Sequence, residues 1–286
     1  MMENAAGSIQ LVVFADDTNA VVSADNISNL NTIVNQTLDI FHSWFAVNGL
    51  KINASKTNVM LFRSTSKNKD SIQCEINGEK VNVVEVVKFL GVYIDSQLKW
   101  KEELNYVVKA ISPACYVLRS LRNDVTIKHL KMVYYALVES RLRYSILFWG
   151  GSYDYNIQKA FVIQKRAVRT MVRIQQQESC KPHFTDLNIL TVPSLYVLVL
   201  LTHLSKYIFE YETEEERLRR ESTRRKDLQL QQVTHLNVAK HSSFHKSLKL
   251  FNRLPTEIKG LVYKSEFHNK LKQFLLKKCL YHIDEL

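Results

Sequence analysis

The sequence predicts an α+β fold, with short strands in the first third of the chain and helices in the remainder. From Leu11 to Ile94, β-branched runs of strand length alternate with turn residues. Beyond Trp100, apolar residues recur at spacings of three and four, which is the period of an amphipathic helix. The 286 residues include only 7 Gly and 4 Pro, and 46% are hydrophobic, as in a globular protein that buries a core.

A hairpin is the first element that the sequence predicts. Leu11–Phe14 and Thr18–Val22 are apolar runs of about strand length, and only Ala-Asp-Asp at residues 15–17 separates them. A tight turn at these three residues places Asp16 and Asp17 at the tip of the hairpin.

A helix and further strands are expected before residue 100. Apolar residues at helical spacing predict the helix from Leu30 to Phe45, with Ser28 as its N-cap and Asn48–Gly49 as its end. A polar loop is expected at Ser64–Asp70. The strand signals are Asn58–Phe62, a Cys74–Val81 hairpin with an Asn-Gly turn, and Val83–Ile94, one more strand broken by Gly91.

The rest of the chain predicts helices. The expected ranges are Leu104–Leu121 with a kink or break at Pro113, Ile127–Phe148, Ile157–Ile174, Ser194–Tyr211, Glu214–Gln232 and Ser265–Leu280. Four basic side chains on the third of these helices recur at helical spacing and are expected to form one basic stripe: Lys165, Arg166, Arg169 and Arg173.

Charge is distributed unevenly along the chain, which has a net charge of +11. Residues 1–98 carry 7 Lys and Arg against 10 Asp and Glu, and residues 181–216 carry 2 against 6. Residues 99–180 carry 14 against 6, and residues 217–286 carry 16 against 6. An acidic module followed by basic ones indicates a metal centre beside surfaces that hold phosphate backbones. Solvated basic helices explain the same charges without any ligand.

Cysteine spacing and hydropathy indicate an intracellular protein that is not secreted. Four cysteines without metal-ligand spacing are expected to be free thiols: Cys74, Cys115, Cys180 and Cys279. Met1–Ser8 lacks a signal-peptide pattern, and the longest apolar run, Leu195–Leu204, has about half the length that a bilayer requires. We expect no transmembrane segment and a location in the nucleus or the cytoplasm.

Asp16 and Asp17 are the candidate metal ligands. Adjacent carboxylates at a turn repel each other, and a bound cation relieves that repulsion. Mg²⁺ takes hard oxygen ligands, often one or two carboxylates completed by water and substrate phosphates, and it serves nucleotidyl transfer in this way. The alternative is an ordinary turn, because an Asp side chain readily caps its own backbone.

Six motifs stand in order along the chain. They are Phe-Ala-Asp-Asp at 14–17, Asn-Gly-Leu-Lys-Ile-Asn at 48–53 followed by Lys56, Phe-Leu-Gly-Val at 89–92, Gln-Lys-Arg-Ala-Val-Arg at 164–169, Ile-Leu-Thr-Val-Pro-Ser-Leu-Tyr at 189–196 and Phe-Asn-Arg-Leu-Pro at 251–255. In this order they resemble the reverse transcriptases of non-LTR (LINE-type) retrotransposons of insects. Each motif alone is weak, whereas the ordered set is specific.

The resemblance implies a polymerase architecture and activity. Residues 1–98 would be the C-terminal half of a palm, an antiparallel sheet with a packed helix. Residues 99–180 would be a helical thumb, and residues 181–286 a basic helical C-terminal region. The implied activity is RNA-directed DNA polymerisation by two Mg²⁺ ions, with an RNA template, a DNA primer and a dNTP as partners. The oligomeric state stays open.

The resemblance also implies roles for individual residues. Asp16 and Asp17 would be the catalytic carboxylates and metal ligands, and Lys56 would lie near the phosphates of the incoming nucleotide, unless it is a solvated turn lysine. The strand at Phe89, Leu90 and Gly91 would be the primer grip, with Gly91 allowing close backbone approach. The basic stripe would hold the template–primer duplex through its phosphates.

The chain departs from the family pattern in three places. The family's fingers and first catalytic aspartate precede the Phe-Ala-Asp-Asp hairpin, and here only Met1–Gln10 precede it. We therefore expect a truncated C-terminal part that is inactive by itself. The alternatives are a non-catalytic nucleic-acid-binding remnant that uses the basic thumb and tail, and an unstable product with exposed sheet edges. Glu103 stands where the family has His, which we interpret as a surface change, and His183 stands where it has an apolar residue.

Overall fold

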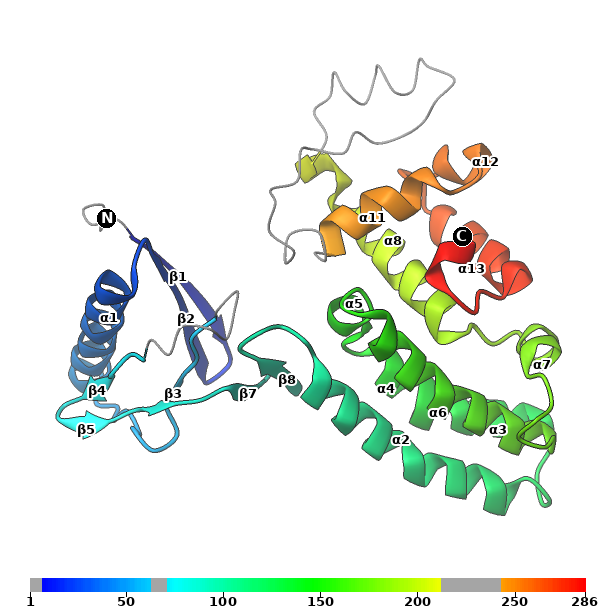
Figure 1. The fold of residues 1–286 in the computed structure, drawn as a ribbon, viewed down its shortest axis with the longest axis horizontal. Coiled ribbons are helices and arrows are strands. Elements are labelled where there is room, and N and C mark those ends of the chain that lie inside the picture. The colour runs from blue at the N-terminus through cyan, green and yellow to red at the C-terminus, as the bar shows by residue number, and fades with distance from the viewer. Residues whose placement is uncertain (1–6, 63–70, 212–242) are drawn as a thin grey trace. The chain divides into compact units, whose positions relative to one another are not determined.

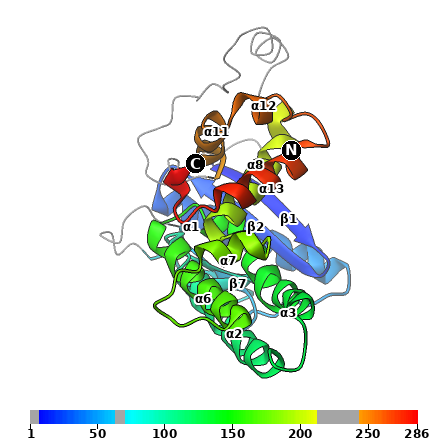
Figure 2. The same cartoon turned by 90° about the vertical axis from the view of Figure 1, so that its right-hand side faces the viewer.

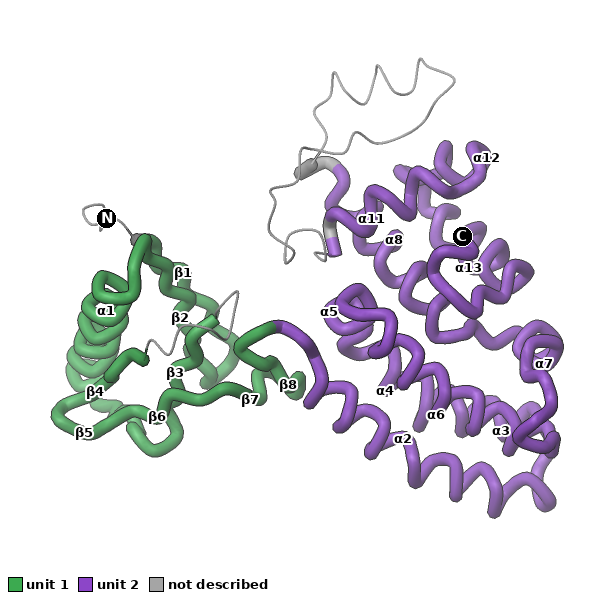
Figure 3. The backbone as a smooth tube through the Cα atoms, in the orientation of Figure 1, with its two compact units in different colours: residues 1–97 green, residues 98–286 purple. Residues whose placement is uncertain are grey.

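The chain forms two compact units, residues 1–97 and 98–286 (Figure 3). The computed structural model describes residues 7–62, 71–211 and 243–286. Unit 1 combines short strands with one helix and unit 2 is helical (Figure 1), so the α+β class is confirmed. The predicted polar loop at 64–70 and the predicted helix at 214–232 lie outside the described residues.

Unit 1 begins with the expected long hairpin, formed by β1 (Gly7–Phe14) and β2 (Asp17–Ala24). The later strands are β3 (Asn58–Val59), β4 (Glu75–Ile76), β5 (Glu79–Lys80), β6 (Asn82–Val83), β7 (Val86–Phe89) and β8 (Val92–Asp95). The predicted Asn-Gly hairpin is confirmed as β4 and β5, joined by Asn77 and Gly78 with φ of 51° and 77°.

The strands pair as separate two-stranded ladders in the described residues, so the expected assignment of this unit to a palm sheet is not confirmed. β1–β2, β4–β5 and β7–β8 are antiparallel, whereas β3–β6 is parallel. The predicted single strand at 83–94 is wrong. Leu90 and Gly91, with φ of 46° and 84°, reverse the chain between β7 and β8, because left-handed backbone at two successive residues closes a tight turn.

The helix α1 spans Ile27–Val47, close to its predicted bounds. Its N-cap is Asn26 rather than Ser28, because the Asn26 side chain accepts a hydrogen bond from the Asn29 backbone N–H at 2.8 Å. The predicted end is confirmed at Asn48 and Gly49, whose φ of 71° suits glycine.

Asparagine side chains attach α1 to the segment before β4. The Asn35 amide donates to the Gln73 carbonyl at 2.9 Å and accepts from the Glu75 N–H at 3.1 Å, and Asn31 accepts from the Gln73 N–H at 2.9 Å. Beneath these bonds lies a small hydrophobic cluster made of Val34, Leu38, Ile72, Cys74, Ile76 and Val81. This cluster and its polar clamp hold the helix beside the hairpin.

Unit 2 is a helical unit. Its elements are α2 (Lys101–Leu121), α3 (Ile127–Tyr134), a π-helical turn (Tyr135–Glu139), α4 (Ser140–Arg143), α5 (Ile146–Trp149), α6 (Asp154–Val172), α7 (Lys181–Asp186), α8 (Val192–Tyr211), α11 (Ser243–Asn252), α12 (Thr256–Lys259), α13 (Phe267–Lys278) and a final 3₁₀ turn (Ile283–Glu285). Figure 2 shows α2, α3 and α6 lying side by side. No helix among the described residues combines the length and apolar character that crossing a bilayer requires.

Two helix predictions in unit 2 need correction. α2 continues through Pro113, which is exposed, so the helix does not break there. The single helix expected at 127–148 is instead divided by the π-helical turn and by a break at Tyr144 and Ser145. Hydrogen bonds among the buried side chains of Glu103, Ser145 and Trp149 hold this break in place.

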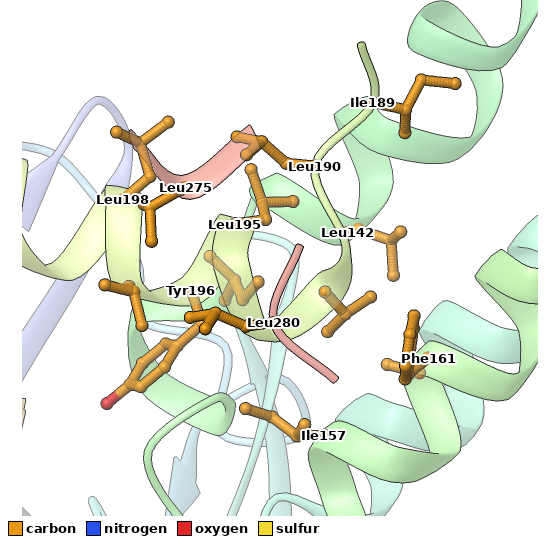
Figure 4. Packing of buried hydrophobic residues seen from close by; sticks show 14 of the residues in the cluster. Leu142, Ile157, Phe161, Ile189, Leu190, Leu195, Tyr196, Leu198, Leu275 and Leu280 are labelled. Carbon is orange, nitrogen blue, oxygen red and sulfur yellow. The ribbon is translucent and has the colours of Figure 1, made fainter. Parts of the chain in front are cut away.

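One hydrophobic core includes residues from α2 to the end of α13, and Figure 4 shows part of it. The side chains of Leu142, Phe161, Leu195 and Leu275 come from four different helices and are almost entirely buried. Tyr196 packs on Gly150, where a Cβ atom would lie 2.5 Å from both the Ile146 carbonyl oxygen and a Tyr196 ring carbon. Glycine at this position is therefore a requirement of the core packing.

Candidate catalytic hairpin and basic helical surface

The hairpin tip presents the two candidate carboxylates. Phe14 pairs with Asp17, which leaves Ala15 and Asp16 as a two-residue loop. Ala15 has φ of 52°, and the mirror-image turns that suit two-residue hairpins require a positive φ at this first loop position. Asp16 thus lies in the loop and Asp17 is the first residue of β2.

Both carboxylates are free for a ligand. Asp16 and Asp17 are exposed, and their carboxylates form no ion pair or hydrogen bond with any part of the chain that the structure describes. Directly paired residues share a face of a hairpin, so Asp17 lies on the face of Phe14, and the alternate residues Val12 and Val21 lie there too. Val22, on the other face, contacts the cluster under α1, so Asp17 lies on the face turned away from this helix.

The donor type at the tip fits Mg²⁺, although the donor set is small. Mg²⁺ binds through one or two carboxylates and completes its shell with water and phosphate oxygens. Asp16 and Asp17 supply two such carboxylates. Within residues 7–62, 71–211 and 243–286, no three His, Cys, Asp or Glu side chains gather as a metal site. Two metal ions therefore require a carboxylate in addition to those that the described residues bring together.

Apolar side chains surround the tip and remain exposed. Leu11, Val13, Phe14 and Val21 are 54%, 64%, 61% and 56% exposed. In the described residues the β1–β2 ladder has no third strand, so both outer edges keep unpaired backbone groups. An apolar, unpaired hairpin of this kind is a surface for a further strand or chain.

Lys56 projects into solvent from a turn at residues 54–56. The Asn53 carbonyl accepts a hydrogen bond from the Lys56 N–H at 3.1 Å, and the Asn53 side chain accepts one from the Ser55 hydroxyl at 2.6 Å. Asn53 thereby fixes the turn that carries Lys56. The ammonium group makes no ion pair with the described residues, as expected of either a nucleotide-binding or a solvated lysine.

The expected primer-grip residues lie at a hairpin tip rather than within a strand. Phe89 ends β7 and is half-buried, and Leu90 and Gly91 form the loop before β8. No hydrogen bond or ion pair of Asp16, Asp17 or Lys56 joins them to this loop in the described part of the chain.

The four basic residues of α6 point to different neighbours. The Lys165 ammonium lies 4.6 Å from the centre of the Phe161 ring, and the Arg169 guanidinium donates to the Glu178 carbonyl at 3.2 Å. Arg173, the left-handed C-cap of α6, donates to the Arg122 carbonyl. Arg166 is exposed. The expected single stripe is thus divided.

The pKa values of two buried thiols are affected by different members of this set. Burial raises the pKa of Cys115, and the charges of Arg166 and Arg119 partly oppose that rise. Burial likewise raises the pKa of Cys180, where the opposing charges are those of Arg169 and Lys165. Arg166 and Arg119 of α2 thus lie near Cys115, whereas Lys165 and Arg169 lie near Cys180.

Lys181 and Tyr281 lie beside Lys165, and the sequence does not single them out. The Lys181 ammonium lies 5.3 Å and the Lys165 ammonium 5.8 Å from the centre of the Tyr281 ring. The three residues are far apart along the chain and belong to no common motif, so no sequence signal joins them.

Gln164, the first residue of the motif on α6, has a structural role. Gln164 is fully buried, donates to the Tyr134 hydroxyl at 2.7 Å and to the Leu190 carbonyl at 2.8 Å, and accepts from the Val192 N–H at 2.8 Å. These bonds join α6 to α3 and to the start of α8. They explain the presence of glutamine at this position without a nucleic-acid contact.

Thr191 and Ser194 join the start of α8 to the chain end. The Thr191 hydroxyl donates to the Leu280 carbonyl at 2.5 Å, and the Leu280 N–H donates to the Ser194 hydroxyl at 3.2 Å. Both side chains are buried, so this part of the motif also serves the fold.

Glu103 is not at the surface, so its interpretation as a surface change is wrong. It is 1% exposed, and its carboxylate accepts a hydrogen bond from the Ser145 hydroxyl at 2.5 Å. The same hydroxyl accepts from the Trp149 indole N–H at 3.2 Å. These buried hydrogen bonds therefore link α2 to the break before α5. His183 is half-buried on α7, with its Nδ1 atom 4.0 Å from an Asp186 oxygen.

Comparison with known proteins gives relatives of one kind. The chain is 23% identical over 168 residues to an RNA-directed DNA polymerase from the mobile element jockey of Drosophila funebris. It is 24% identical over 204 residues to a probable RNA-directed DNA polymerase from transposon BS of Drosophila melanogaster, and 20% identical over 164 residues to the jockey polymerase of the same species.

These matches cover 58%, 69% and 56% of this chain but only 18%, 22% and 18% of the relatives. The chain thus spans less than a quarter of the length of the curated relatives that it matches. No family model and no solved structure matches it. As its ordered motifs predict, the chain is similar, at low identity, to RNA-directed DNA polymerases of Drosophila mobile elements.

Proposed function

We propose that this chain carries the catalytic hairpin and the duplex-holding helices of an RNA-directed DNA polymerase. The observation that supports this most directly is the Phe-Ala-Asp-Asp motif at residues 14–17. It closes a two-residue hairpin whose two carboxylates are exposed and free of partners in the described residues. The relatives bear the name of that activity.

Asp16 and Asp17 would hold Mg²⁺ at the tip through their carboxylate oxygens. When bound, the metal supplies charge stabilisation for the attacking and leaving oxygens of a phosphoryl transfer. Asp17 lies on the face of the hairpin turned away from α1, where a nucleotide has open access. Lys56 would attract the phosphates of that nucleotide, and the exposed loop at Leu90 and Gly91 would approach the primer strand.

The exposed hairpin supports a second part of the proposal. One tip with two carboxylates does not bridge two ions, and the apolar faces and edges beside it are uncovered in the described residues. We infer that a further strand docks beside β1 and β2 and brings another carboxylate. The present chain is then inactive alone because its metal site is incomplete.

Metal binding at the tip tests the first part. We expect Mn²⁺, used as a paramagnetic probe, to broaden the amide signals of Asp16 and Asp17, and Mg²⁺ to reverse the broadening. Asp16→Asn should weaken this binding by about tenfold or more, because one of two anionic ligands is lost. Asp25→Asn, an exposed aspartate outside the tip, is the matched control. Equal effects of the two variants contradict the proposal.

Primer extension tests the second part. We expect no template-dependent dNTP incorporation by the purified chain in Mg²⁺. Incorporation that Asp16→Ala abolishes would show that the chain completes the site with its own residues, and the inference of a docked strand would be wrong.

A further inference from the structure

Three basic side chains and one tyrosine of unit 2 meet at one place. Lys165 and Arg169 come from α6, Lys181 begins α7, and Tyr281 follows α13. The two ammonium groups lie 5.8 Å and 5.3 Å from the Tyr281 ring centre. Arg169 is close enough for its charge to act on the Tyr281 hydroxyl. We call these four residues the Tyr281 cluster.

The Tyr281 ring is held in a fixed position. It meets Phe161 edge-on with ring centres 4.8 Å apart and Phe184 at 6.5 Å, and both phenylalanines are buried. Its backbone N–H donates to the Glu285 carboxylate at 3.0 Å. The ring packed in this way lies within cation–π range of both ammonium groups.

The cluster contains donors without acceptors. The Tyr281 hydroxyl and the Arg169 Nε–H are both buried and have no hydrogen-bond partner in the described residues. Lys165 and Lys181 form no ion pair there either. Lysine and arginine only donate, so none of the three cations offers an acceptor to the hydroxyl. A buried donor without an acceptor costs stability, which makes this site incomplete without a further group.

Two carboxylates near the cluster each accept a hydrogen bond from a backbone N–H group. Glu178 accepts a hydrogen bond from the Gln175 N–H at 2.7 Å, and Glu285 accepts the Tyr281 N–H. Burial raises the pKa of Tyr281 to about 12, with the Cys180 and Cys279 thiols next in effect. The phenol therefore keeps its proton at neutral pH and remains a donor.

We propose that the Tyr281 cluster binds a phosphate group of a nucleic-acid strand, between the two ammonium groups, the Arg169 Nε–H and the Tyr281 hydroxyl. A phosphate group offers oxygens in several directions to donors that come from three segments, which a planar carboxylate does less well. The excess of basic residues in 99–180 favours a strand over a free ion. Calling the strand a template or primer rests on the proposed function, whereas the phosphate site does not.

Strand binding by the full chain in EDTA tests the proposal. A labelled single-stranded RNA is titrated by fluorescence anisotropy at several salt concentrations. We expect the double variant Lys165→Gln/Lys181→Gln to weaken binding by about tenfold and to lower the log–log salt slope by ~0.7, the value for one phosphate contact on a single strand. Tyr281→Phe keeps every charge and should weaken binding by about five- to tenfold, because it removes one hydrogen bond to an anion.

A matched control removes the same charge elsewhere. Lys270 and Lys272 are exposed on α13, so Lys270→Gln/Lys272→Gln lowers the net charge equally without touching the cluster. Each variant is first checked for an unchanged thermal transition. Equal weakening by the control, or an unchanged salt slope in the cluster variant, overturns the proposal.

Two further measurements distinguish a strand-binding site from a free-anion site, and the phosphate site from the metal site. Inorganic phosphate is titrated against the labelled strand. If phosphate binds at the cluster while the cluster variants leave strand affinity unchanged, the site serves a free anion and the strand assignment is wrong. Asp16→Asn should leave strand affinity in EDTA unchanged, so failure of the metal site and failure of the phosphate site give different results.

Discussion

Two tyrosine hydroxyl groups in the core of unit 2 differ in whether they have a hydrogen-bond partner. The Tyr134 hydroxyl accepts a hydrogen bond from Gln164 at 2.7 Å, whereas the Tyr196 hydroxyl is buried without a partner in the described residues. Both side chains are fully buried. Burial raises the pKa of both phenols, so each stays neutral over the physiological range.

This difference predicts opposite responses to the same substitution. Tyr134→Phe should lower the free energy of unfolding by about 1–2 kcal/mol, because one Gln164 N–H loses its acceptor. Tyr196→Phe should leave it unchanged or raise it by up to ~1 kcal/mol, because it removes a desolvated hydroxyl that bonds nothing. Urea unfolding of the two variants and the parent chain measures both values. A loss in Tyr196→Phe equal to that in Tyr134→Phe would show that the Tyr196 hydroxyl has a partner.

Motif residues show what sequence reasoning finds and what it misses at this scale. Gln164, Thr191 and Ser194 are recognised in the sequence as parts of ordered motifs. Their work in the fold is to bond backbone groups of Leu190, Val192 and Leu280, which depends on helices that meet only after folding. Lys181 and Tyr281 lie in no motif, so a surface assembled from distant segments had no local signal.

Elements with strong local chemistry were predicted well. The β1–β2 hairpin follows from two β-branched runs, and the β4–β5 hairpin follows from Asn-Gly, a pair that readily adopts positive φ. Leu90 and Gly91 form an equally tight turn, yet leucine rarely adopts a φ of 46°, so the sequence predicts one strand where β7 and β8 form a hairpin.

The single helix predicted at 127–148 is divided in the structure, although no local signal in the sequence predicts a break. Its apolar spacing is continuous, and the sequence contains neither Gly nor Pro to interrupt it. The break before α5 is fixed instead by the buried bonds between Glu103, Ser145 and Trp149. Tertiary hydrogen bonds of this kind are invisible to periodicity.

The hairpin tip carries a strain that can be removed without touching the carboxylates. Ala15→Gly should stabilise the β1–β2 ladder by about 0.5–1 kcal/mol. Left-handed backbone costs a non-glycine residue ~1–2 kcal/mol, and part of this gain is lost because glycine gives up more conformational entropy on folding. Amide hydrogen exchange of the residues paired across the ladder measures the change. Ala20→Gly, in the regular part of β2, is the control and should weaken protection. Faster exchange in Ala15→Gly contradicts the strained turn.

At the scale of the whole molecule, the two units have separate cores. The small cluster of unit 1 and the large core of unit 2 share no residue. In the described residues, the unit 2 core continues across the expected boundary at 180 and 181, so a functional division there stays a prediction. The acidic segment 1–98 and the basic segment 99–180 correspond to different tasks in the proposal, with a metal site in unit 1 and a phosphate site in unit 2.

Separate cores predict separate unfolding. A chain of residues 98–286 should unfold cooperatively, with the same urea midpoint as the helical signal of the full chain, because its hydrophobic cluster needs no residue of unit 1. It should also keep the strand affinity of the full chain in EDTA, since the Tyr281 cluster lies within it. Circular dichroism at increasing urea measures the midpoint, and residues 1–97 alone are the counterpart, expected to melt broadly because Leu11, Val13 and Phe14 remain exposed. A shift of the helical midpoint worth more than ~1 kcal/mol would mean that unit 1 stabilises unit 2, and the two would then have to be treated as one folding unit.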